Sequence, residues 1–312
     1  MERLETEIYL RYKQIIESQG FVVPAAGESP APRRVRMEDL LDRYDAFCFD
    51  GYGTLYNRGS FVYEGALDWY TMLRAAGKQM RLITNAASDV DSVLAADAGK
   101  RGFAFSETET ISSGSLLKDL CAELRGCGKA VREVYYIGRE TGKHVLENCG
   151  IKAVAPAVEP VEPIVAISSA KDTPETYEQA VKILRRPGSM LLVLNSDAWA
   201  PKIPGDDGMT VREPVSGELS ERLRRDSMCE ANGGAGCETY YLGKPFPAIW
   251  EKVKRSLPEG SRVLMVGDTL GTDVLGARIA GFDSALVVGR NVPADELETD
   301  EKALGIRPDY YL

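Results

Sequence analysis

The chain has 312 residues, of which 44% are hydrophobic and 27% charged, and its formal net charge is −9. This composition is that of an ordinary globular protein, long enough for one large or two modest domains. The acidic balance argues against binding to DNA or RNA, and no apolar run approaches the roughly 20 residues of a membrane span. Because the first residues lack the apolar region of a signal peptide, we expect a cytoplasmic protein with no nucleic-acid or membrane partner.

Apolar residues recur at helical spacing over residues 4–19, which predicts an amphipathic helix. Proline, alanine and glycine dominate the stretch that follows it. We therefore interpret residues 1–39 as a helix and a linker. Packing of this helix against the protein's own core is the expectation, and packing against a partner is the alternative.

The most informative stretch is Phe47–Tyr56, which reads FCFDGYGTLY. Its apolar run ends at Asp50, which predicts a buried strand whose carboxylate lies at the carboxyl edge of a parallel sheet. Gly51 and Gly53 allow a tight turn and a close approach to a ligand. An aspartate in this place can act as a nucleophile or as a ligand of a hard metal ion, and a simple turn cap is the alternative.

Short apolar runs alternate with helical patterns along the rest of the chain. The predicted strands lie at 46–49, 80–83, 134–137, 164–167, 190–194, 262–266 and 284–288. The predicted helices lie at about 64–76, 88–100, 116–125, 142–148, 174–187, 247–256 and 272–280. This alternation is typical of an α/β protein with a doubly wound, Rossmann-like parallel sheet. The charged tail from Asn291 to Leu312 is expected to pack at an edge.

Three further motifs follow Asp50 in a fixed order. They are LITN, which contains Thr84 and Asn85, then LGKP, which contains Lys244, and VGDT followed by TD, which contain Asp268 and Asp273. Because parallel strands align their carboxyl ends, these side chains can converge on one crevice. Crowded carboxylates repel one another unless a hard cation such as Mg²⁺ lies among them, and a lysine adds positive charge for a nucleophile or a phosphate.

Together the four motifs resemble those of the haloacid dehalogenase superfamily of phosphatases and related hydrolases, over about residues 44 to 290. The resemblance implies phosphoryl transfer to Asp50, with Mg²⁺ as cofactor, and then hydrolysis of the aspartyl-phosphate. It implies that Thr84 and Asn85 bind the phosphate and that Lys244 is the charge partner. The metal ligands that it implies are Asp50, the backbone carbonyl of Tyr52, Asp268 and Asp273.

The α/β segment between the second and third motifs is interpreted as an inserted cap domain. Its position, together with the run LGKPFP, resembles the subfamily of nucleotide, phosphoglycolate, pyridoxal-phosphate and nitrophenyl phosphatases. In that subfamily the cap selects a small phosphorylated substrate and often supports a homodimer. We expect Asn195 and Asp197 of the cap to line the cleft as substrate-binding residues, while Trp199 belongs either to the cleft or to the core of the cap. The expected domains are a core of 40–125 and 239–312 and a cap of 126–238.

Tyr52 departs from the pattern of most phosphatases of the superfamily. They carry at this position an aspartate that protonates the leaving group and activates water, whereas a tyrosine can donate a proton but is a poor base near neutral pH. The motif DGYGTL also resembles that of the 2-haloacid dehalogenases, although the 34 positions from Asp50 to Thr84 are too few for their helical cap. The main expectation is a phosphatase-like hydrolase; a dehalogenase and a low-turnover protein that binds a phosphorylated ligand are the alternatives.

Overall fold

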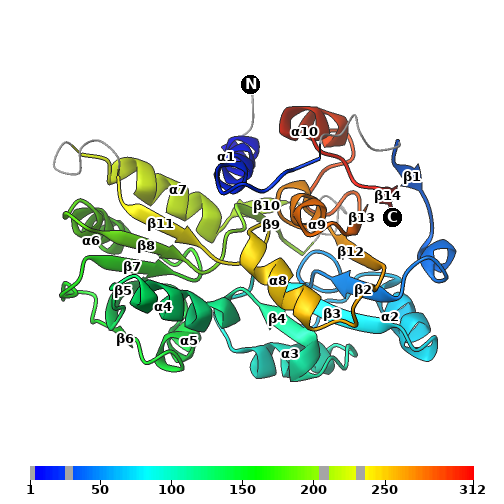
Figure 1. Ribbon diagram of the computed structural model, residues 1–312, viewed down its shortest axis with the longest axis horizontal. Coiled ribbons are helices and arrows are strands. Elements are labelled where there is room, and N and C mark those ends of the chain that lie inside the picture. The colour runs from blue at the N-terminus through cyan, green and yellow to red at the C-terminus, as the bar shows by residue number, and fades with distance from the viewer. Residues whose placement is uncertain (1–3, 25–30, 204–210, 230–235) are drawn as a thin grey trace.

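A computed structural model describes residues 4–24, 31–203, 211–229 and 236–312 (Figure 1). Its largest sheet has seven strands. In spatial order they are β1 (Arg33–Arg34), β14 (Tyr310–Tyr311), β13 (Asp283–Leu286), β12 (Val263–Gly267), β2 (Ala46–Phe49), β3 (Gln79–Thr84) and β4 (Thr110–Ser112). All the pairings in this sheet are parallel.

A second parallel sheet lies beside the first (Figure 1). In spatial order its strands are β11 (Glu238–Tyr241), β8 (Met190–Val193), β7 (Ile164–Ile167), β5 (Glu133–Ile137) and β6 (Lys152–Ala153). A short antiparallel pair, β9 (Trp199–Pro201) and β10 (Arg212–Pro214), adjoins it. The predicted fold class, an α/β protein with a doubly wound parallel core and an inserted α/β cap, is confirmed.

Helices cover the faces of both sheets (Figure 1). They are α1 (Leu4–Ser18), α2 (Ala66–Ala75), α3 (Asp91–Lys100), α4 (Leu117–Gly126), α5 (Lys143–Glu147), α6 (Pro174–Leu184), α7 (Ser216–Asp226), α8 (Pro247–Arg255), α9 (Leu275–Ala280) and α10 (Leu297–Leu304). The sequence analysis did not predict α7 or α10, and a π-helical turn, Leu270–Val274, begins the helix that it placed at 272–280. In the described parts of the chain, no helix is both long and apolar enough to cross a membrane.

The order of the strands in the larger sheet creates a crevice at its carboxyl edge. The chain runs outward from β2 through β3 to β4, then returns to the other side of β2 and runs through β12 and β13 to β14. Open α/β sheets bind ligands where the strand order reverses in this way. Asp50 follows β2, Thr84 ends β3 and Asp268 follows β12, so three of the four predicted motifs meet at this crevice.

The remaining motif, LGKP, reaches the crevice from the smaller sheet. Strand β11, which precedes Lys244, pairs in parallel with β8, so it lies in the second sheet and extends beyond the boundary expected at residue 238. The sequence analysis assigned residues 239–312 to the core and did not include this strand among those that it predicted. A four-residue strand carries no signal that tells one parallel sheet from another, so only the pairing partner decides the assignment.

Helix α1 packs across the junction of the two sheets, between α7 and α10 (Figure 1). Its buried residues Ile8, Tyr9, Tyr12 and Ile16 share one hydrophobic cluster with residues of both halves, among them Ala198, Phe246, Leu270, Val274 and Leu275. Polar contacts flank this cluster, because Arg11 pairs with Glu221 of α7 at 3.3 Å and the amine of Lys13 donates to the carbonyl of Leu304 in α10 at 3.0 Å. The helix thus packs on its own chain, as expected, and connects the cap side to the core side.

Gly271→Ala should weaken the packing of α1. Gly271 lies in the π-helical turn, and a Cβ at this position would overlap the ring of Tyr9. Overpacking of this kind typically lowers the free energy of unfolding by about 1–3 kcal/mol, which urea unfolding would measure. Gly99→Ala in α3 is the matched control, because a Cβ at Gly99 meets nothing within 4 Å. Equal stability of the two variants would contradict this account.

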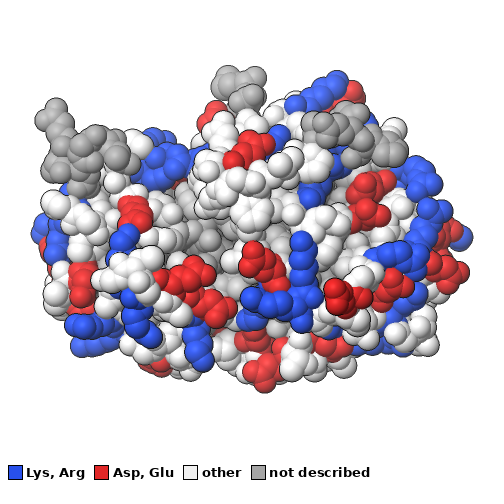
Figure 2. Space-filling view, in the orientation of Figure 1, with Lys and Arg blue, Asp and Glu red and all other residues white. Residues whose placement is uncertain are grey.

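Charged side chains of both signs are interspersed over the face of the molecule shown in Figure 2. Lys and Arg lie beside Asp and Glu on this face and do not gather in one basic strip. Clustered positive charge is what binds a nucleic-acid backbone. This face therefore lacks the usual nucleic-acid-binding feature.

Candidate active site

Three carboxylates from the predicted motifs form a buried cluster at the crevice. One oxygen from each of Asp50, Asp268 and Asp273 lies within 4.8 Å of the others. Burial raises the pKa of Asp50 to about 7, and burial together with the neighbouring carboxylates raises the pKa of Asp268 well above its usual value. Concentrated negative charge of this kind attracts a cation.

Lys244 supplies one positive charge to this cluster. Its amine donates to Oδ1 of Asp50 at 2.6 Å and to Oδ1 of Asp273 at 2.7 Å, and the side chain is buried. Although burial alone would lower the pKa of Lys244, the carboxylates of Asp273, Asp50 and Asp197 raise it above its usual value. The amine is therefore charged at neutral pH, and it holds the carboxylate of Asp50 in one orientation.

The carboxylate oxygens of Asp273 and Asp268 differ in whether the protein supplies them with hydrogen-bond donors. Oδ2 of Asp273 accepts from the backbone N–H groups of Asp268 and Thr269, both at 3.1 Å, so both oxygens of Asp273 are occupied by the protein. Oδ1 of Asp268 accepts from the hydroxyl of Thr269 at 3.0 Å, whereas its buried Oδ2 has no hydrogen-bond donor among the described residues. Buried polar atoms rarely lack partners, so this oxygen fits a metal ligand.

Gly53 makes room for that oxygen. It has a φ of +97°, which favours glycine, and a Cβ at this position would overlap Oδ2 of Asp268. The backbone of the first motif therefore lies directly against the carboxylate of the fourth. Asp50 and Asp268 offer hard oxygen ligands of the kind that a small divalent cation prefers, and the backbone carbonyl of Tyr52 as a further ligand stays a prediction.

Asn85 connects the motifs to one another. Its Nδ2 donates to Oδ1 of Asp197 at 2.8 Å and to the carbonyl of Lys244 at 3.0 Å, and its Oδ1 accepts from the N–H of Lys244 at 2.7 Å. The side-chain amide is thus hydrogen-bonded within the protein, and the phosphate contact expected of Asn85 stays a prediction. Thr84 is buried, with its hydroxyl accepting from the N–H of Ala86 at 3.1 Å, and it lines the cavity described next.

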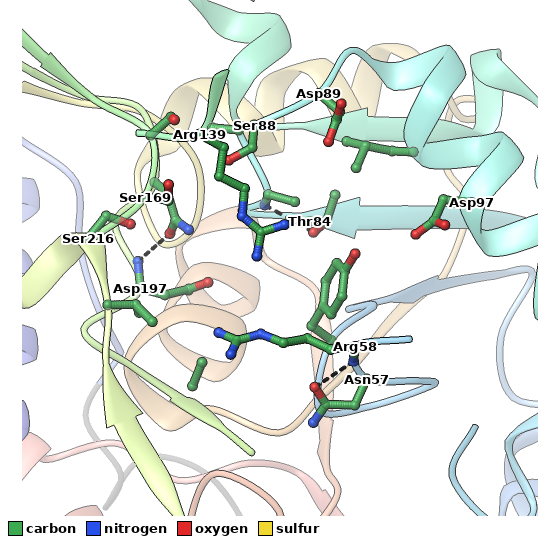
Figure 3. Close-up of a pocket in the computed structure, with 18 of the residues that line it drawn as sticks. Asn57, Arg58, Thr84, Ser88, Asp89, Asp97, Arg139, Ser169, Asp197 and Ser216 are labelled. Carbon is green, nitrogen blue, oxygen red and sulfur yellow. Dashed lines mark hydrogen bonds between the residues drawn. The ribbon is translucent and has the colours of Figure 1, made fainter. Parts of the chain in front are cut away.

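A cavity of about 580 Å³ opens beside Asp50, between the two sheets (Figure 3). The predicted site residues that line it are Asp50, Tyr52, Thr84, Asn195 and Asp197. Oδ1 of Asn195 accepts from the N–H of Asp197 at 2.9 Å, which fixes this segment of the cap. Trp199, whose place the sequence left open, packs against the hydrophobic cluster of α1.

Tyr52 lines the cavity with its ring against Tyr56. The two ring centroids are 5.1 Å apart in an edge-to-face arrangement. Burial raises the pKa of Tyr52 above its usual value, so its hydroxyl remains protonated at neutral pH. This group can donate a proton to a leaving group, but it cannot take one from water.

The sequence analysis missed the cationic residues of the cavity, which are Arg58, Lys100, Arg101, Arg139 and Lys171. Arg58 follows the first motif, and Arg139 follows β5 in the cap; both point into the cavity (Figure 3). Neither belongs to a motif, and single arginines in loops carry no signal of their own in a sequence. Their shared direction depends on how the two sheets pack together.

Asp197→Asn should stabilise the metal-free protein at about pH 8 but not at about pH 4. Burial raises the pKa of Asp197 to about 6, above the value of about 4 in an unfolded chain, so ionisation destabilises the fold as the pH rises through this window. The asparagine removes that charge and still accepts from Asn85. We expect a gain of about 1–3 kcal/mol above pH 6, measured by urea unfolding across pH. A gain that does not depend on pH would contradict the assignment.

Comparison with known proteins identifies the family. Residues 47–152 match the family model of haloacid dehalogenase-like hydrolases, and residues 241–312 match a second model, of HAD-hydrolase-like proteins. The two matches together cover more than half of the chain. The chain belongs to the haloacid dehalogenase superfamily. This result confirms the family predicted from the four motifs.

Relatives of this haloacid dehalogenase superfamily member include proteins that are named as phosphatases. Mouse chronophin is 26% identical over 261 residues, which cover 82% of this chain and 85% of chronophin. Human glycerol-3-phosphate phosphatase is 27% identical over 277 residues, which cover 81% of each chain. These matches support the subfamily of phosphatase-like hydrolases with an α/β cap.

A solved structure of the superfamily shares the fold. The 4-nitrophenylphosphatase of Thermotoga maritima superposes with a TM-score of 0.63 at 23% identity, over 88% of this chain and 95% of that one. At this identity the likeness supports the fold alone. The arrangement of the two sheets is therefore one that the superfamily also adopts elsewhere.

Proposed function

We propose that this chain is a Mg²⁺-dependent phosphatase that hydrolyses a small phosphomonoester through an aspartyl-phosphate on Asp50. The observation that carries the proposal is the position of Asp50, which is held by Lys244 in a buried carboxylate cluster and opens onto a cavity of about 580 Å³. The phosphatases among its relatives support the same reaction class. The cytoplasmic location and the homodimer expected from the sequence stay predictions.

Each residue has a defined part in this reaction. An oxygen of Asp50 attacks phosphorus, and the bond between phosphorus and the leaving-group oxygen breaks. Lys244 stabilises the negative charge on the phosphoryl oxygens, and the hydroxyl of Thr84 donates to one of them. Mg²⁺, held by Asp50, Asp268 and the carbonyl of Tyr52, would neutralise charge on the phosphate. Water then attacks the phosphorus of the aspartyl-phosphate and regenerates Asp50.

Tyr52 can assist the first of the two half-reactions but not the second. Its hydroxyl can protonate the leaving group of the first step, and the phenolate that remains regains a proton from solvent because burial raises the pKa of Tyr52. Once protonated again, Tyr52 offers no base for the water of the second step. We therefore infer that hydrolysis of the aspartyl-phosphate is the slow step. A phosphorylated protein should accumulate during turnover.

Tyr52→Asp should raise turnover by about 10²-fold, because general base catalysis typically contributes about 10²–10⁴-fold. The expected gain lies in the second step, so the burst of phosphorylated protein seen by rapid quench should shrink. Tyr52→Phe is the matched control, since it removes the hydroxyl and supplies no carboxylate. An aspartate variant no faster than the natural chain would show that the cavity serves other chemistry.

The proposal is tested by phosphate release from a panel of small phosphomonoesters, with and without Mg²⁺. Halide release from 2-chloropropionate is measured in parallel, because the motif DGYGTL also resembles that of the dehalogenases. Phosphate release that depends on Mg²⁺ is the expected result. Halide release without metal would overturn the proposal in favour of a dehalogenase, and silence in both assays would favour a ligand-binding protein.

A further inference from the structure

Two arginines meet in the cavity from opposite sides. Arg58 extends from the core loop after the first motif, and Arg139 extends from the cap loop after β5 (Figure 3). Acidic side chains line the cavity as well, among them Asp89 and Glu213, and Glu213 pairs with Arg58. A guanidinium presents several N–H donors in a planar fork that suits carboxylate and phosphate groups.

The backbone beneath Arg58 is anchored. Oδ1 of Asn57 accepts from the N–H of Arg58 at 2.8 Å, and Nδ2 of Asn57 donates to the carbonyl of Pro201 at 3.0 Å and to the hydroxyl of Tyr63 at 3.1 Å. The guanidinium of Arg58 forms an ion pair with Glu213 of β10, which holds it toward the cap. Its other N–H groups can still donate to a ligand.

The backbone beneath Arg139 is anchored as well. Its carbonyl accepts from the hydroxyl of Tyr136 at 3.0 Å, and a Cβ at Gly138 or Gly142 would overlap that same hydroxyl. In the described parts of the chain, the guanidinium of Arg139 makes no hydrogen bond or ion pair. Arg139 is exposed, so water hydrates its N–H donors, and an anion that enters the cavity can take the place of that water.

The two arginines serve a different part of the site from Lys244. The amine of Lys244 contacts Asp50 and Asp273 in the buried cluster, and Lys244 is not among the residues that line the cavity, whereas Arg58 and Arg139 line its wall. The phosphoryl group that Asp50 attacks therefore lies with Lys244, and the arginines face the portion of the substrate beyond it.

We propose that the substrate carries a second anionic group, a carboxylate or another phosphate, which Arg139 of the cap and Arg58 of the core bind together. The inference rests on the phosphatase function proposed above and narrows its substrate class to phosphomonoesters with a nearby second anion. Arg58 lies in a loop of the core and Arg139 in a loop of the cap, so an anion that binds both arginines connects the two halves of the protein. An uncharged sugar or nucleoside would leave the guanidinium of Arg139 without an anionic partner, whereas Arg58 would keep its ion pair with Glu213.

A matched pair of substrates tests this inference. Phosphoglycolate and propyl phosphate have chains of similar length, and only the first ends in a carboxylate. We expect kcat/KM to be about tenfold or more higher for phosphoglycolate, which corresponds to one charge-assisted hydrogen bond. Equal values for the two substrates would overturn the inference while leaving the phosphatase function in place. The second anion could also be a phosphate group in place of a carboxylate, and ethylene glycol bisphosphate tests this case.

Variants assign the preference to the arginines. Arg139→Gln and Arg58→Gln should each reduce the ratio of the two kcat/KM values about tenfold, mainly because phosphoglycolate binds more weakly and its KM rises. Arg132→Gln is the matched control, because Arg132 precedes the opposite end of β5, is exposed and does not line the cavity. An unchanged ratio in both cavity variants, or an equal loss in the control, would overturn the assignment.

Binding distinguishes failure of the inference from failure of the proposed function. Calorimetry on the Asp50→Asn protein measures the affinity for each substrate without turnover. If the natural chain releases no phosphate from any ester and phosphoglycolate still binds more tightly, the phosphatase function is contradicted and the anion site is supported. Equal binding of the two compounds would overturn the anion site whatever the activity.

Discussion

Asp50→Asn protein should fold as the natural chain does and should release essentially no phosphate. The amide has the shape of the carboxylate, and its oxygen can still accept from Lys244, which keeps its bond to Asp273 at 2.7 Å. An amide is not a nucleophile, so no aspartyl-phosphate can form. Loss of an enzyme nucleophile reduces turnover by several orders of magnitude, and we expect a loss on the order of 10⁴-fold or more.

Asp45→Asn is the control for this variant. Asp45 precedes β2 and Asp50 follows it, so the same substitution is made at opposite ends of one strand. Asp45 is exposed and pairs with Arg262 at 3.0 Å, away from the cavity. Phosphate release and urea unfolding are measured on both proteins. Activity of the Asp50 variant within tenfold of the control would rule out attack by Asp50.

The candidate site could be predicted largely because of how parallel strands are arranged. Asp50 and Asp268 each follow a short buried strand and Thr84 ends one, and these strands, β2, β12 and β3, are neighbours in the sheet. Parallel strands that pair side by side bring their carboxyl ends together, so a polar residue directly after each strand reaches one crevice. The order of the motifs along the chain was therefore enough to place these residues near one another.

The strand that positions Lys244 could not be assigned to its sheet by this reasoning. The amine of Lys244 contacts Asp50, the predicted nucleophile, and also Asp273, but the strand that leads to this lysine belongs to the smaller sheet. Local sequence predicts that a strand ends and that a lysine follows. It does not predict the partner of the strand, because that choice depends on the packing of residues that are far apart in the chain.

Other features carry no local signal at all. Strands β1 and β14 contain two residues each, which is too short for any periodic pattern. They also pair across nearly the whole length of the chain. The convergence of Arg58 and Arg139 depends on loops anchored by Asn57 and Tyr136. Such anchors are tertiary hydrogen bonds, so only the folded structure shows where the side chains point.

Lys244→Met should be the most destabilising single change in the site. It leaves the carboxylates of Asp50 and Asp273 buried without their shared cation. Removing one partner of a buried ion pair typically costs about 3–5 kcal/mol, which we expect as a loss in the free energy of unfolding at neutral pH. The loss should shrink as the pH falls, because the raised pKa of Asp50 lets it take up a proton and neutralise itself.

Lys302→Met provides the comparison that isolates burial. Lys302 pairs with Glu298 at 2.7 Å, which is also the distance between Lys244 and Asp273. Both members of the pair of Lys302 and Glu298 are exposed, however. Solvent screens an exposed pair, so this variant should unfold at nearly the same urea concentration as the natural chain. Addition of Mg²⁺ should restore part of the stability of the Lys244 variant alone, since a cation among Asp50, Asp268 and Asp273 replaces the missing charge. Equal stability of the two variants, or no response to Mg²⁺, would show that the carboxylate cluster is not the electrostatic centre that its geometry indicates.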